Sequence, residues 1–310
     1  MPKYKTALVT GGAGFIGSHV VDALIRQHIK VYVIDDLSRG LQKNVNPNAH
    51  FVKMSITSSQ LPALLKRMKP DIIFHLAAQI DVQKAIKNPS EDALVNIVGT
   101  LKLANEAVEV GVKKFVFSST GGAMYSDHGR PPYDESCPAT PVSPYGIAKR
   151  SAEMYLAFLQ EMSGMSSVVL RYANVYGPRQ RSDGEAGVIA IFGGCLLSGK
   201  QAVINGDGKQ TRDYVYVEDV VRANLLAMNK AVTGIFNIGT GKQASVNTLF
   251  RKLRKMAKSK MVERHAPACS GEILRTALQC KKAKKELGWS PRTTLDEGLV
   301  KTMKWLMKKS

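Results

Sequence analysis

The chain has few cysteines and no long apolar run. Its four cysteines, Cys137, Cys195, Cys269 and Cys280, share no C-x-x-C spacing. They therefore indicate neither a zinc site nor a disulfide framework. No apolar run approaches the ~18 residues that cross a bilayer, and the first residues, Met-Pro-Lys-Tyr-Lys, lack the apolar region of a signal peptide. We expect no metal site, no membrane span and a cytoplasmic protein.

Acidic side chains are also scarce relative to basic ones. The chain has 25 Asp and Glu against 44 Lys and Arg, a formal net charge of +19. Residues 251–310 alone hold 17 Lys and Arg but five Asp and Glu. Such a surface can attract nucleic acid, anionic lipid or anionic metabolites. Because no zinc-finger spacing or aromatic RNA-binding motif accompanies it, the charge favours a solvated helix face over a polyanion site and predicts no specific nucleic-acid partner.

The 310 residues are enough for a large core, and 44% of them are hydrophobic. In the first half, short apolar runs alternate with helical patterns, which is typical of a parallel sheet covered on both faces. Strands are expected at 6–10, 30–35, 50–53, 71–75, 113–118 and 167–171, and helices at 15–27, 91–110 and 145–162. This order predicts an α/β, doubly wound parallel-sheet Rossmann fold, with a ligand crevice beyond the carboxyl ends of the strands.

After residue 171 the pattern becomes irregular. Gly and Pro punctuate residues 177–187 and 205–208, which suits a smaller C-terminal substrate lobe. A helix is expected at 220–228, a strand at 236–238 and a helix at 245–258. We predict that residues 1–173, with about 215–241, form the Rossmann domain, and that 174–214 and 242–310 form the smaller lobe.

A glycine turn marks a nucleotide site. Gly11, Gly14 and Gly17 follow the first predicted strand and open the first helix, where a pyrophosphate can lie against free backbone amides. Asp35 ends the second strand, where a carboxylate accepts hydrogen bonds from an adenosine ribose and repels a 2′-phosphate. This favours NAD over NADP, although Arg39 just beyond it could accommodate a phosphate.

Tyr145 and Lys149 form a second site. Residues four apart on a helix share one face, so the lysine ammonium can stabilise the ionised phenol. A tyrosine base then becomes usable near neutral pH. The Y-x-x-x-K spacing is common in helices, and the upstream nucleotide site gives it significance here. The two sites together predict proton transfer beside a bound nucleotide.

Seven segments of the chain carry a family resemblance. They are Thr10-Gly-Gly-Ala-Gly-Phe-Ile-Gly17, His75-Leu-Ala-Ala-Gln79, Phe117-Ser-Ser-Thr120, Tyr145 with Lys149, Arg171-Tyr-Ala-Asn-Val-Tyr-Gly-Pro178, Arg212-Asp-Tyr-Val-Tyr-Val-Glu-Asp219 and Phe236-Asn-Ile-Gly-Thr240. Over nearly its whole length the chain resembles the extended short-chain dehydrogenase/reductase family, and within it the UDP-hexose 4-epimerases. The resemblance implies NAD-dependent 4-epimerisation of a UDP-hexose through a transient 4-keto sugar. The expected substrates are UDP-glucose and UDP-galactose, and the N-acetylhexosamines stay open as further substrates.

The resemblance also implies roles for individual residues. Tyr145 is the acid/base, and Lys149 binds the nicotinamide ribose and lowers the tyrosine pKa. Thr120, or alternatively Ser119, hydrogen-bonds the sugar hydroxyl, although the Thr120 hydroxyl could also merely cap its strand. The implied NAD contacts are Gly11, Gly14, Phe15, Ile16, Gly17, Asp35, Ser38, Leu76, Ala77, Ala78, Asn96, Ser118, Tyr145, Lys149 and Tyr172.

The UDP-sugar is the implied substrate partner. Its implied contacts are Asn174, Val188, Arg212, Glu272, Arg275 and Thr276. Val188 lies in the segment 187–192, which would present a helix N-terminus to the phosphates. The charged residues among them could equally be ordinary surface charges.

Four positions depart from, or vary within, the family pattern. Ser55 stands in place of an aspartate that contacts adenine, Cys269 in place of a pyrophosphate-binding arginine, and Gln279 in place of a late aspartate. Thr276 is small where members restricted to unacetylated sugars have a large aromatic gate, so it leaves room for an N-acetyl group.

Other functions stay open at this point. Dehydratases and decarboxylases place an acid shortly after the catalytic Ser/Thr, whereas Thr120-Gly-Gly-Ala-Met-Tyr125 has none, which favours epimerisation. The alternatives are another NAD-dependent nucleotide-sugar reaction (UDP-glucuronate epimerase or decarboxylase, dehydratase or reductase) and, more remotely, a non-catalytic NAD-sensing scaffold. The resemblance further implies a homodimer formed through two helices per subunit.

Overall fold

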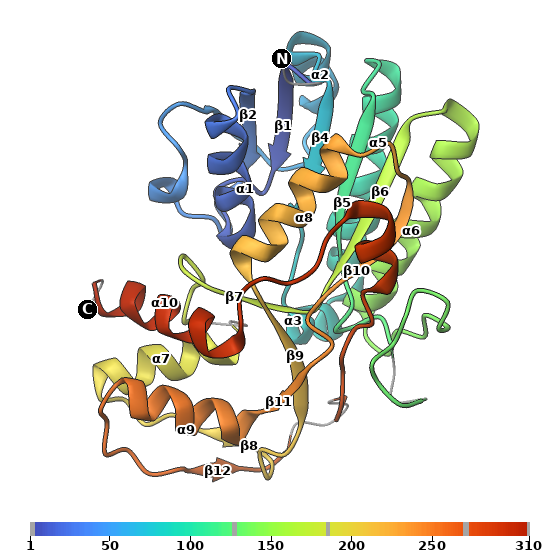
Figure 1. Cartoon of the computed structure of the whole chain (residues 1–310). Coiled ribbons are helices and arrows are strands. Elements are labelled where there is room, and N and C mark those ends of the chain that lie inside the picture. The colour runs from blue at the N-terminus through green and yellow to red at the C-terminus, as the bar shows by residue number, and fades with distance from the viewer. Residues whose placement is uncertain (1–3, 126–128, 184–186, 269–272, 309–310) are drawn as a thin grey trace.

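The computed structural model describes residues 4–125, 129–183, 187–268 and 273–308. Its central sheet has seven parallel strands in the order β10-β6-β5-β4-β1-β2-β3 (Figure 1). Their bounds are β1 Thr6–Thr10, β2 Lys30–Asp35, β3 His50–Lys53, β4 Ile72–His75, β5 Lys114–Thr120, β6 Ser166–Tyr172 and β10 Gly234–Ile238. The strand order reverses direction between β1 and β4, so the predicted doubly wound Rossmann fold is confirmed and a crevice opens there.

Helices cover both faces of this sheet because successive strand residues point to opposite faces. Val9 and Val116 pack with α1 (Phe15–Arg26) and α8 (Val217–Asn229) on one face. Leu8 and Phe115 pack with α2 (Leu61–Met68), α5 (Thr100–Glu109) and α6 (Pro144–Ser163) on the other. Buried on both faces, the strands therefore read as nearly continuous apolar runs in the sequence.

The predicted helix at 91–110 is interrupted in the structure. It consists of α4 (Pro89–Ala93), a π-helical segment η2 (Leu94–Gly99) and α5. A further short helix, α3 (Val82–Lys87), precedes them, and a single 3-10 turn, η1 (Gln42–Asn44), follows β2. The apolar period of the sequence did not reveal the π turn. Within it, Asn96 accepts a hydrogen bond from the Gln79 amide and donates one to the Gln79 carbonyl oxygen.

A smaller lobe lies beyond the carboxyl ends of the strands (Figure 1). Its strands are β7 (Asn174–Tyr176), β9 (Thr211–Tyr216) and β11 (Gln243–Ser245) in one sheet and β8 (Ile204–Asn205) with β12 (His265–Ala266) in another, and its helices are α7 (Val188–Ser198), α9 (Val246–Met256) and α10 (Leu295–Met307). A separate core holds it together, in which the Phe192 and Phe250 rings meet edge to face, 5.6 Å between centroids.

Part of the C-terminal region packs on the main sheet and not on the smaller lobe. Leu278, Trp289 and the π-helical segment η3 (Ala283–Leu287) join the core of the α1/α8 face. The Trp289 indole donates a hydrogen bond to the backbone oxygen of Asp219 at the start of α8, 2.8 Å away. The chain after residue 242 therefore contributes to both cores, and the predicted division into domains stays a prediction.

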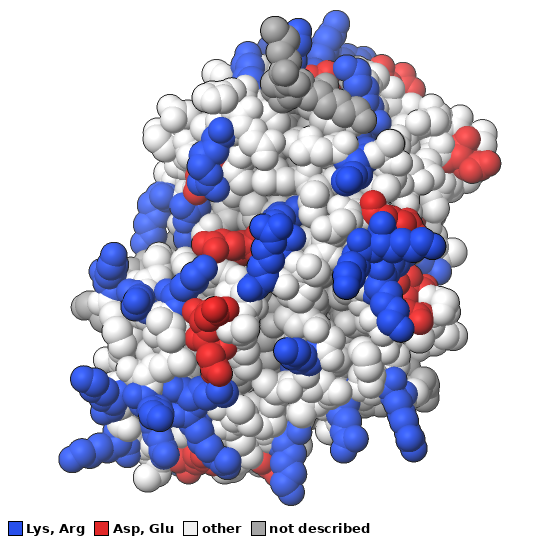
Figure 2. Space-filling view, viewed as in Figure 1, with Lys and Arg blue, Asp and Glu red and all other residues white. Residues whose placement is uncertain are grey.

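Basic side chains are spread over much of the visible surface. Figure 2 shows them gathered where α9 and α10 lie in Figure 1, and again around η3. Some are paired there, such as Arg251 with Glu263 and Lys301 with Glu218, and exposed pairs of this kind contribute little to stability. Within the described ranges, none of the helices has both the length and the hydrophobicity needed to traverse a bilayer.

Candidate active site

A cleft of about 550 Å³ opens at the carboxyl ends of β1, β2, β4, β5 and β6. It reaches Gly187 and the segment 179–181, which belong to the connection into the smaller lobe. Its walls include these predicted NAD contacts: Gly11, Gly14, Phe15, Ile16, Gly17, Asp35, Ser38, Leu76, Ala77, Ala78, Ser118, Tyr145, Lys149 and Tyr172. The fold therefore brings the two sequence motifs, separated by more than a hundred residues, to one edge of the sheet.

The glycine turn leaves the start of α1 open. Gly11 has φ +71°, and a Cβ there would lie 2.7 Å from the amide nitrogen of Ala77. A Cβ on Gly17 would lie 2.1 Å from the carbonyl oxygen of Gly11. Gly14 precedes α1 without a side-chain cap, so the first amides of the helix stay available to an anion. This cradle fits a pyrophosphate.

Asp35 is held rigidly at the end of β2. Its Oδ2 accepts a hydrogen bond from the Ala13 amide and its Oδ1 one from the Leu37 amide, both at 2.9 Å. Burial raises the pKa of Asp35 above its usual value. Each carboxylate oxygen retains a second lone pair for a ribose hydroxyl. The guanidinium of Arg39 donates to the backbone oxygen of Asp183, 3.1 Å away, so in this structure it has a protein partner. The residues present fit a dinucleotide with a free adenosine ribose.

Tyr145 and Lys149 occupy the first two turns of α6. Ser143 caps the helix by accepting a hydrogen bond from the Gly146 amide at 3.2 Å, and Pro144 occupies the first turn. The Lys149 ammonium donates to the Ser118 carbonyl oxygen at 2.9 Å and lies 6.0 Å from the Tyr145 ring centroid. Burial lowers the pKa of Lys149 to about 8, against the opposing charges of two nearby carboxylates.

In the chain without ligands, the pKa of the Tyr145 phenol is not lowered. Burial raises the pKa of Tyr145 above its usual value, and the negative charge of Asp92 raises it further. The spacing of Tyr145 and Lys149 led us to expect the opposite direction. Burial dominates, and the Lys149 ammonium is hydrogen-bonded to the Ser118 carbonyl oxygen. In the chain alone, the site therefore favours the neutral phenol.

The two candidate hydroxyls at the end of β5 differ in their partners. Ser119 is buried, and its hydroxyl donates to Glu153 Oε1 at 2.6 Å. The Thr120 oxygen accepts a hydrogen bond from the Ala123 amide at 3.1 Å, so it does cap the end of its strand. Its own proton remains available to another acceptor. The geometry therefore favours Thr120 over Ser119 as a hydroxyl that can face a substrate, although Ser119 and not Thr120 is part of the cleft wall.

Two of the predicted substrate residues lie where the smaller lobe begins. A Cβ built on Gly122 would lie 3.4 Å from Asn174 Oδ1 and 3.9 Å from Thr120 Oγ1, so these two side chains flank the same glycine. Val188 is the first residue of α7, and Gly187 before it provides no side-chain cap. This helix start therefore has no side-chain cap among the described residues, and the phosphate contact implied there stays a prediction.

The remaining described substrate residues meet at β9. The Arg212 guanidinium donates to the Leu274 backbone oxygen at 3.3 Å, and Arg275 pairs with Thr211 through a parallel bridge. Thr276 is 3% exposed, and its amide donates to the Thr211 oxygen at 3.2 Å. None of these described side chains lines the nucleotide cleft. Two predicted positions, Glu272 and Cys269, lie outside the described residues.

Comparison with known proteins agrees with this geometry. The model of the NAD dependent epimerase/dehydratase family matches residues 7–239. The chain belongs to this family. The UDP-glucose 4-epimerase of Mycolicibacterium smegmatis is 41% identical to it over 309 residues, 98% of this chain and 99% of that protein.

Two solved structures are similar over nearly their whole length. The UDP-glucose 4-epimerase of Thermotoga maritima, determined with UDP-glucose, has a TM-score of 0.97 and 48% identity, covering 98% of this chain and 99% of that one. The UDP-N-acetylglucosamine 4-epimerase of Methanobrevibacter ruminantium, in complex with UDP-N-acetylmuramic acid, has a TM-score of 0.94 and 35% identity, covering all of both chains.

In this family member, a buried ion pair fixes α6 against the sheet. The Arg171 guanidinium donates to both oxygens of Glu153, at 2.9 and 2.6 Å, and to the Tyr125 hydroxyl at 2.8 Å. Removing one partner of such a pair is strongly destabilising because it leaves a charge buried alone. Glu153 was not among the predicted site residues, although its position four residues after Lys149 places it on the same helix face.

Asn96 lies behind the cleft and not in its wall. Its Nδ2 donates to the Gln79 carbonyl oxygen at 2.8 Å, and its Oδ1 accepts from the Gln79 amide at 3.0 Å. The same Nδ2 donates to Asp92 at 2.9 Å. Asn96 therefore shapes the loop that carries Gln79, which does line the cleft. In the sequence, the only signal for Asp92 is its position four residues before Asn96.

The family motif around residue 75 holds no acid/base histidine. His75 is fully buried, with its Nδ1 2.7 Å from the Thr10 hydroxyl and its Nε2 2.9 Å from the Thr100 hydroxyl. Burial lowers the pKa of His75 to about 3, helped by the charge of Lys149. The ring is therefore neutral at ordinary pH and serves as a hydrogen-bonded spacer beneath the glycine turn.

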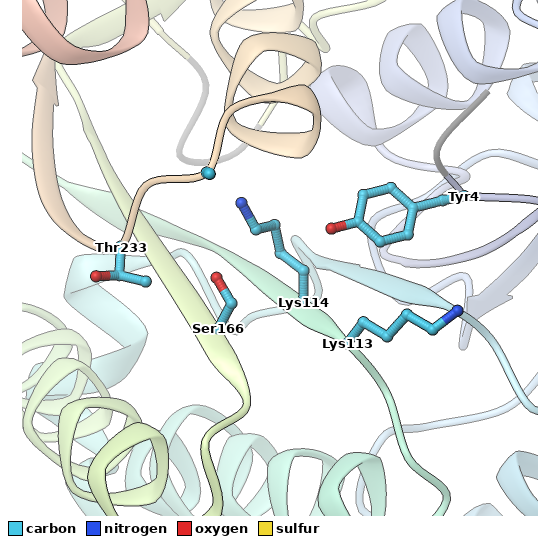
Figure 3. Close-up of a pocket in the computed structure, with 6 residues that line it drawn as sticks. Tyr4, Lys113, Lys114, Ser166 and Thr233 are labelled. Atoms are coloured by element: carbon cyan, nitrogen blue, oxygen red, sulfur yellow. The ribbon is translucent and has the colours of Figure 1, made fainter. Parts of the chain in front are cut away.

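A second hollow, of about 430 Å³, lies at the amino ends of the strands, opposite the cleft. Figure 3 shows the Lys114 side chain between those of Ser166 and Tyr4. The Lys114 ammonium donates to the carbonyl oxygens of Ala227 and Lys230, at 3.0 and 2.6 Å, and so caps the C-terminal end of α8. This lysine has a structural partner and lies away from the proton-transfer residues.

Proposed function

We propose that this protein catalyses the NAD-dependent 4-epimerisation of a UDP-hexose. The observation that carries the proposal is that Tyr145 and Lys149 share one cleft with the glycine turn and Asp35. The similarity to the UDP-glucose 4-epimerases of M. smegmatis and T. maritima supports UDP-glucose and UDP-galactose as substrates. The reaction passes through a transient 4-keto sugar, and the N-acetylhexosamines are proposed as further substrates.

The residues of the cleft are proposed to have separate roles in binding and catalysis. The amides at the start of α1 hold the pyrophosphate of NAD, and Asp35 accepts hydrogen bonds from its adenosine ribose. Bound NAD would supply reversible hydride transfer at the sugar C4. Tyr145 removes and restores the proton of the 4-hydroxyl at its Oη. The protonated ammonium of Lys149 binds the nicotinamide ribose. The Thr120 hydroxyl orients the sugar.

The smaller lobe is proposed to hold the nucleotide part of the substrate. Asn174, Arg212 and Arg275 provide an amide and two guanidinium groups, and the open helix start at Val188 provides backbone amides for the phosphates. Glu272, outside the described residues, is proposed to contact the uridine ribose. The proposed substrate lobe consists of residues 174–214 and 242–310. We also propose that the protein is cytoplasmic.

Epimerisation is favoured over dehydration or decarboxylation by the segment after Thr120. Those reactions need a second acid near the sugar, whereas residues 121–125 are Gly-Gly-Ala-Met-Tyr. Met124 and Tyr125 are buried, and the Ala123 amide is bonded to Thr120. None of these positions supplies a carboxylate to the site.

A homodimer is proposed for the assembly. On α6 the apolar side chains of Met154, Phe158 and Met162 lie on one helix face, at i, i+4 and i+8, and are 59–70% exposed. Leu94 and Val98 of the adjoining η2 segment are both 52% exposed. A contiguous exposed apolar face is typical of a protein interface, and a twofold axis would pack it against the same face of a second copy.

The test of the function is a substrate panel. Purified protein is incubated with NAD and UDP-glucose, UDP-N-acetylglucosamine or UDP-glucuronate, and the products are identified by NMR. We expect the 4-epimers of the first two, with kcat/KM values within roughly tenfold of each other, about 1.4 kcal/mol. Release of water or carbon dioxide would assign the alternative reaction instead, and NAD binding without any product would favour the non-catalytic scaffold.

The Thr276→Tyr variant tests the proposed gate in the same assay. A large ring at this position is expected to lower kcat/KM for the N-acetylated sugar more than for UDP-glucose. If the ratio of the two values is unchanged, Thr276 does not face the sugar, in line with its burial beside β9.

A further inference from the structure

Asp92 is a buried carboxylate with one oxygen left without a partner. The residue is 1% exposed and lies in the short helix α4. Its Oδ1 accepts hydrogen bonds from Gln79 Nε2 and Asn96 Nδ2, both at 2.9 Å. Its Oδ2 is buried and has no hydrogen-bond partner among the described residues. A buried charge is costly unless something balances it, so its neighbours decide its state.

The elements around α4 offer few charges. It packs against α3, η2 and α6, and η2 contains no ionisable side chain. The ionisable groups on α3, α4 and the facing turns of α6 are Lys84, Lys87, Glu91, Tyr145, Lys149, Arg150 and Glu153. Lys84 is half exposed and bonded to Glu91 at 2.6 Å. Burial raises the pKa of Asp92, and among the described residues the cation whose charge opposes that rise is Lys149.

Lys149 is buried as well, and two carboxylates act on it, those of Asp92 and Glu153. The charge of Glu153 is already balanced, because Arg171 donates to both of its oxygens and Arg150 to one of them. Asp92 has no such cation bonded to it in the described part of the chain. Within the described residues, neither Asp92 nor Lys149 is hydrogen-bonded to a group of opposite charge, and α4, which carries Asp92, packs on α6, which carries Lys149.

We propose that Asp92 is the counter-charge of Lys149 and acts through it as a positioning residue of the proton-transfer site. This inference rests on the proposed function, which gives Tyr145 and Lys149 their roles. The negative charge favours the protonated lysine, and it also favours the neutral phenol. Burial and Asp92 act in the same direction on Tyr145, raising its pKa, and in opposite directions on Lys149. Removing the charge must therefore lower both pKa values together.

The Asp92→Asn variant tests this, because asparagine keeps the shape and one oxygen acceptor. In protein labelled with ¹³C-lysine, the Cε resonance of Lys149, assigned by its loss in Lys149→Met, reports the lysine charge. We expect a midpoint near pH 8 in the parent protein and roughly one pH unit lower in Asp92→Asn. Both limbs of the profile of kcat/KM against pH should move in the same, downward direction.

Controls separate a charge effect from a structural one. Glu161→Gln removes one exposed negative charge from the same helix α6 and should leave the midpoint unchanged. Asp92→Ser serves as a second uncharged variant if the Asp92→Asn protein does not fold. An activity loss in Asp92→Asn with the Lys149 midpoint and both limbs unmoved overturns the proposal. Full activity in Tyr145→Phe would instead overturn the proposed function, so the two failures are distinguishable.

Discussion

The proposed chemistry depends on three side chains whose surroundings differ. The Tyr145 phenol is buried with a raised pKa, Lys149 is buried with a lowered one, and Thr120 keeps a free hydroxyl proton while its oxygen closes a turn. A general acid/base works best when its pKa lies near the operating pH. The surroundings of Tyr145 in the chain alone therefore favour its neutral phenol form.

Tyr145→Phe is the sharpest test at this scale. The change deletes one oxygen from a ring that otherwise keeps its packing, so the melting temperature and the NAD affinity should stay close to those of the parent. Turnover of UDP-glucose should fall about 10²–10⁴-fold, the usual contribution of a general acid/base. The measurements are kcat, NAD titration by calorimetry and thermal melting. Turnover close to that of the parent would place the base elsewhere.

At the scale of elements, the turn between β1 and α1 has to be built from glycine at particular positions. At Gly17 a side chain would collide with the Gly11 carbonyl, and at Gly11 with the backbone of Ala77. Both obstacles are backbone atoms, which cannot rotate away as a flexible side chain would. The close approach of backbone to backbone is what opens the start of α1 to a phosphate.

We expect Gly17→Ala to weaken NAD binding by tenfold or more and to destabilise the fold by about 1–3 kcal/mol. The new Cβ, 2.1 Å from the Gly11 carbonyl oxygen, must force the turn apart. The control is Gly111→Ala, where φ is +77° and a Cβ would meet nothing within 4 Å. It should cost about 1 kcal/mol of backbone strain and leave NAD affinity intact. Equal losses of affinity in the two variants would contradict the steric explanation.

On the scale of the whole molecule, the strongly basic surface and the apolar α6 face lead to different expectations. The excess charge is distributed over α9, α10 and η3, and part of it is paired with acidic neighbours (Figure 2). The apolar side chains, in contrast, are concentrated on two adjoining helical segments. Self-association is therefore expected through α6 and η2, and not through the charged lobe.

Replacing Phe158 by Glu should convert a dimer into a monomer. The charge would be buried without a partner at the centre of the proposed interface, and the symmetry places it there twice. Light scattering of the parent should give twice the chain mass, and the variant should give the chain mass. The control is Val262→Glu, an equally exposed apolar side chain outside these helices, which should leave the dimer intact. A monomeric parent protein would remove the basis of this proposal.

The sequence by itself determined the sheet, the position of the glycine turn, Asp35 at the end of β2 and the pairing of Tyr145 with Lys149. These features depend on local periodicity and on residue types at fixed short spacings, which a single chain displays directly. The family resemblance also implied a helix N-terminus within residues 187–192, where α7 begins at Val188.

Only the tertiary structure decided the remaining points. That Ser119 turns to Glu153, that a π turn interrupts the helix around Asn96, and that residues 278–289 pack on the main sheet all depend on partners far away in the sequence. The direction of the Tyr145 pKa shift is also decided by the tertiary structure. A spacing of four residues brings a lysine near a tyrosine, but the burial of both and the presence of Asp92 decide which charge state the site favours, and these are properties of the packed molecule.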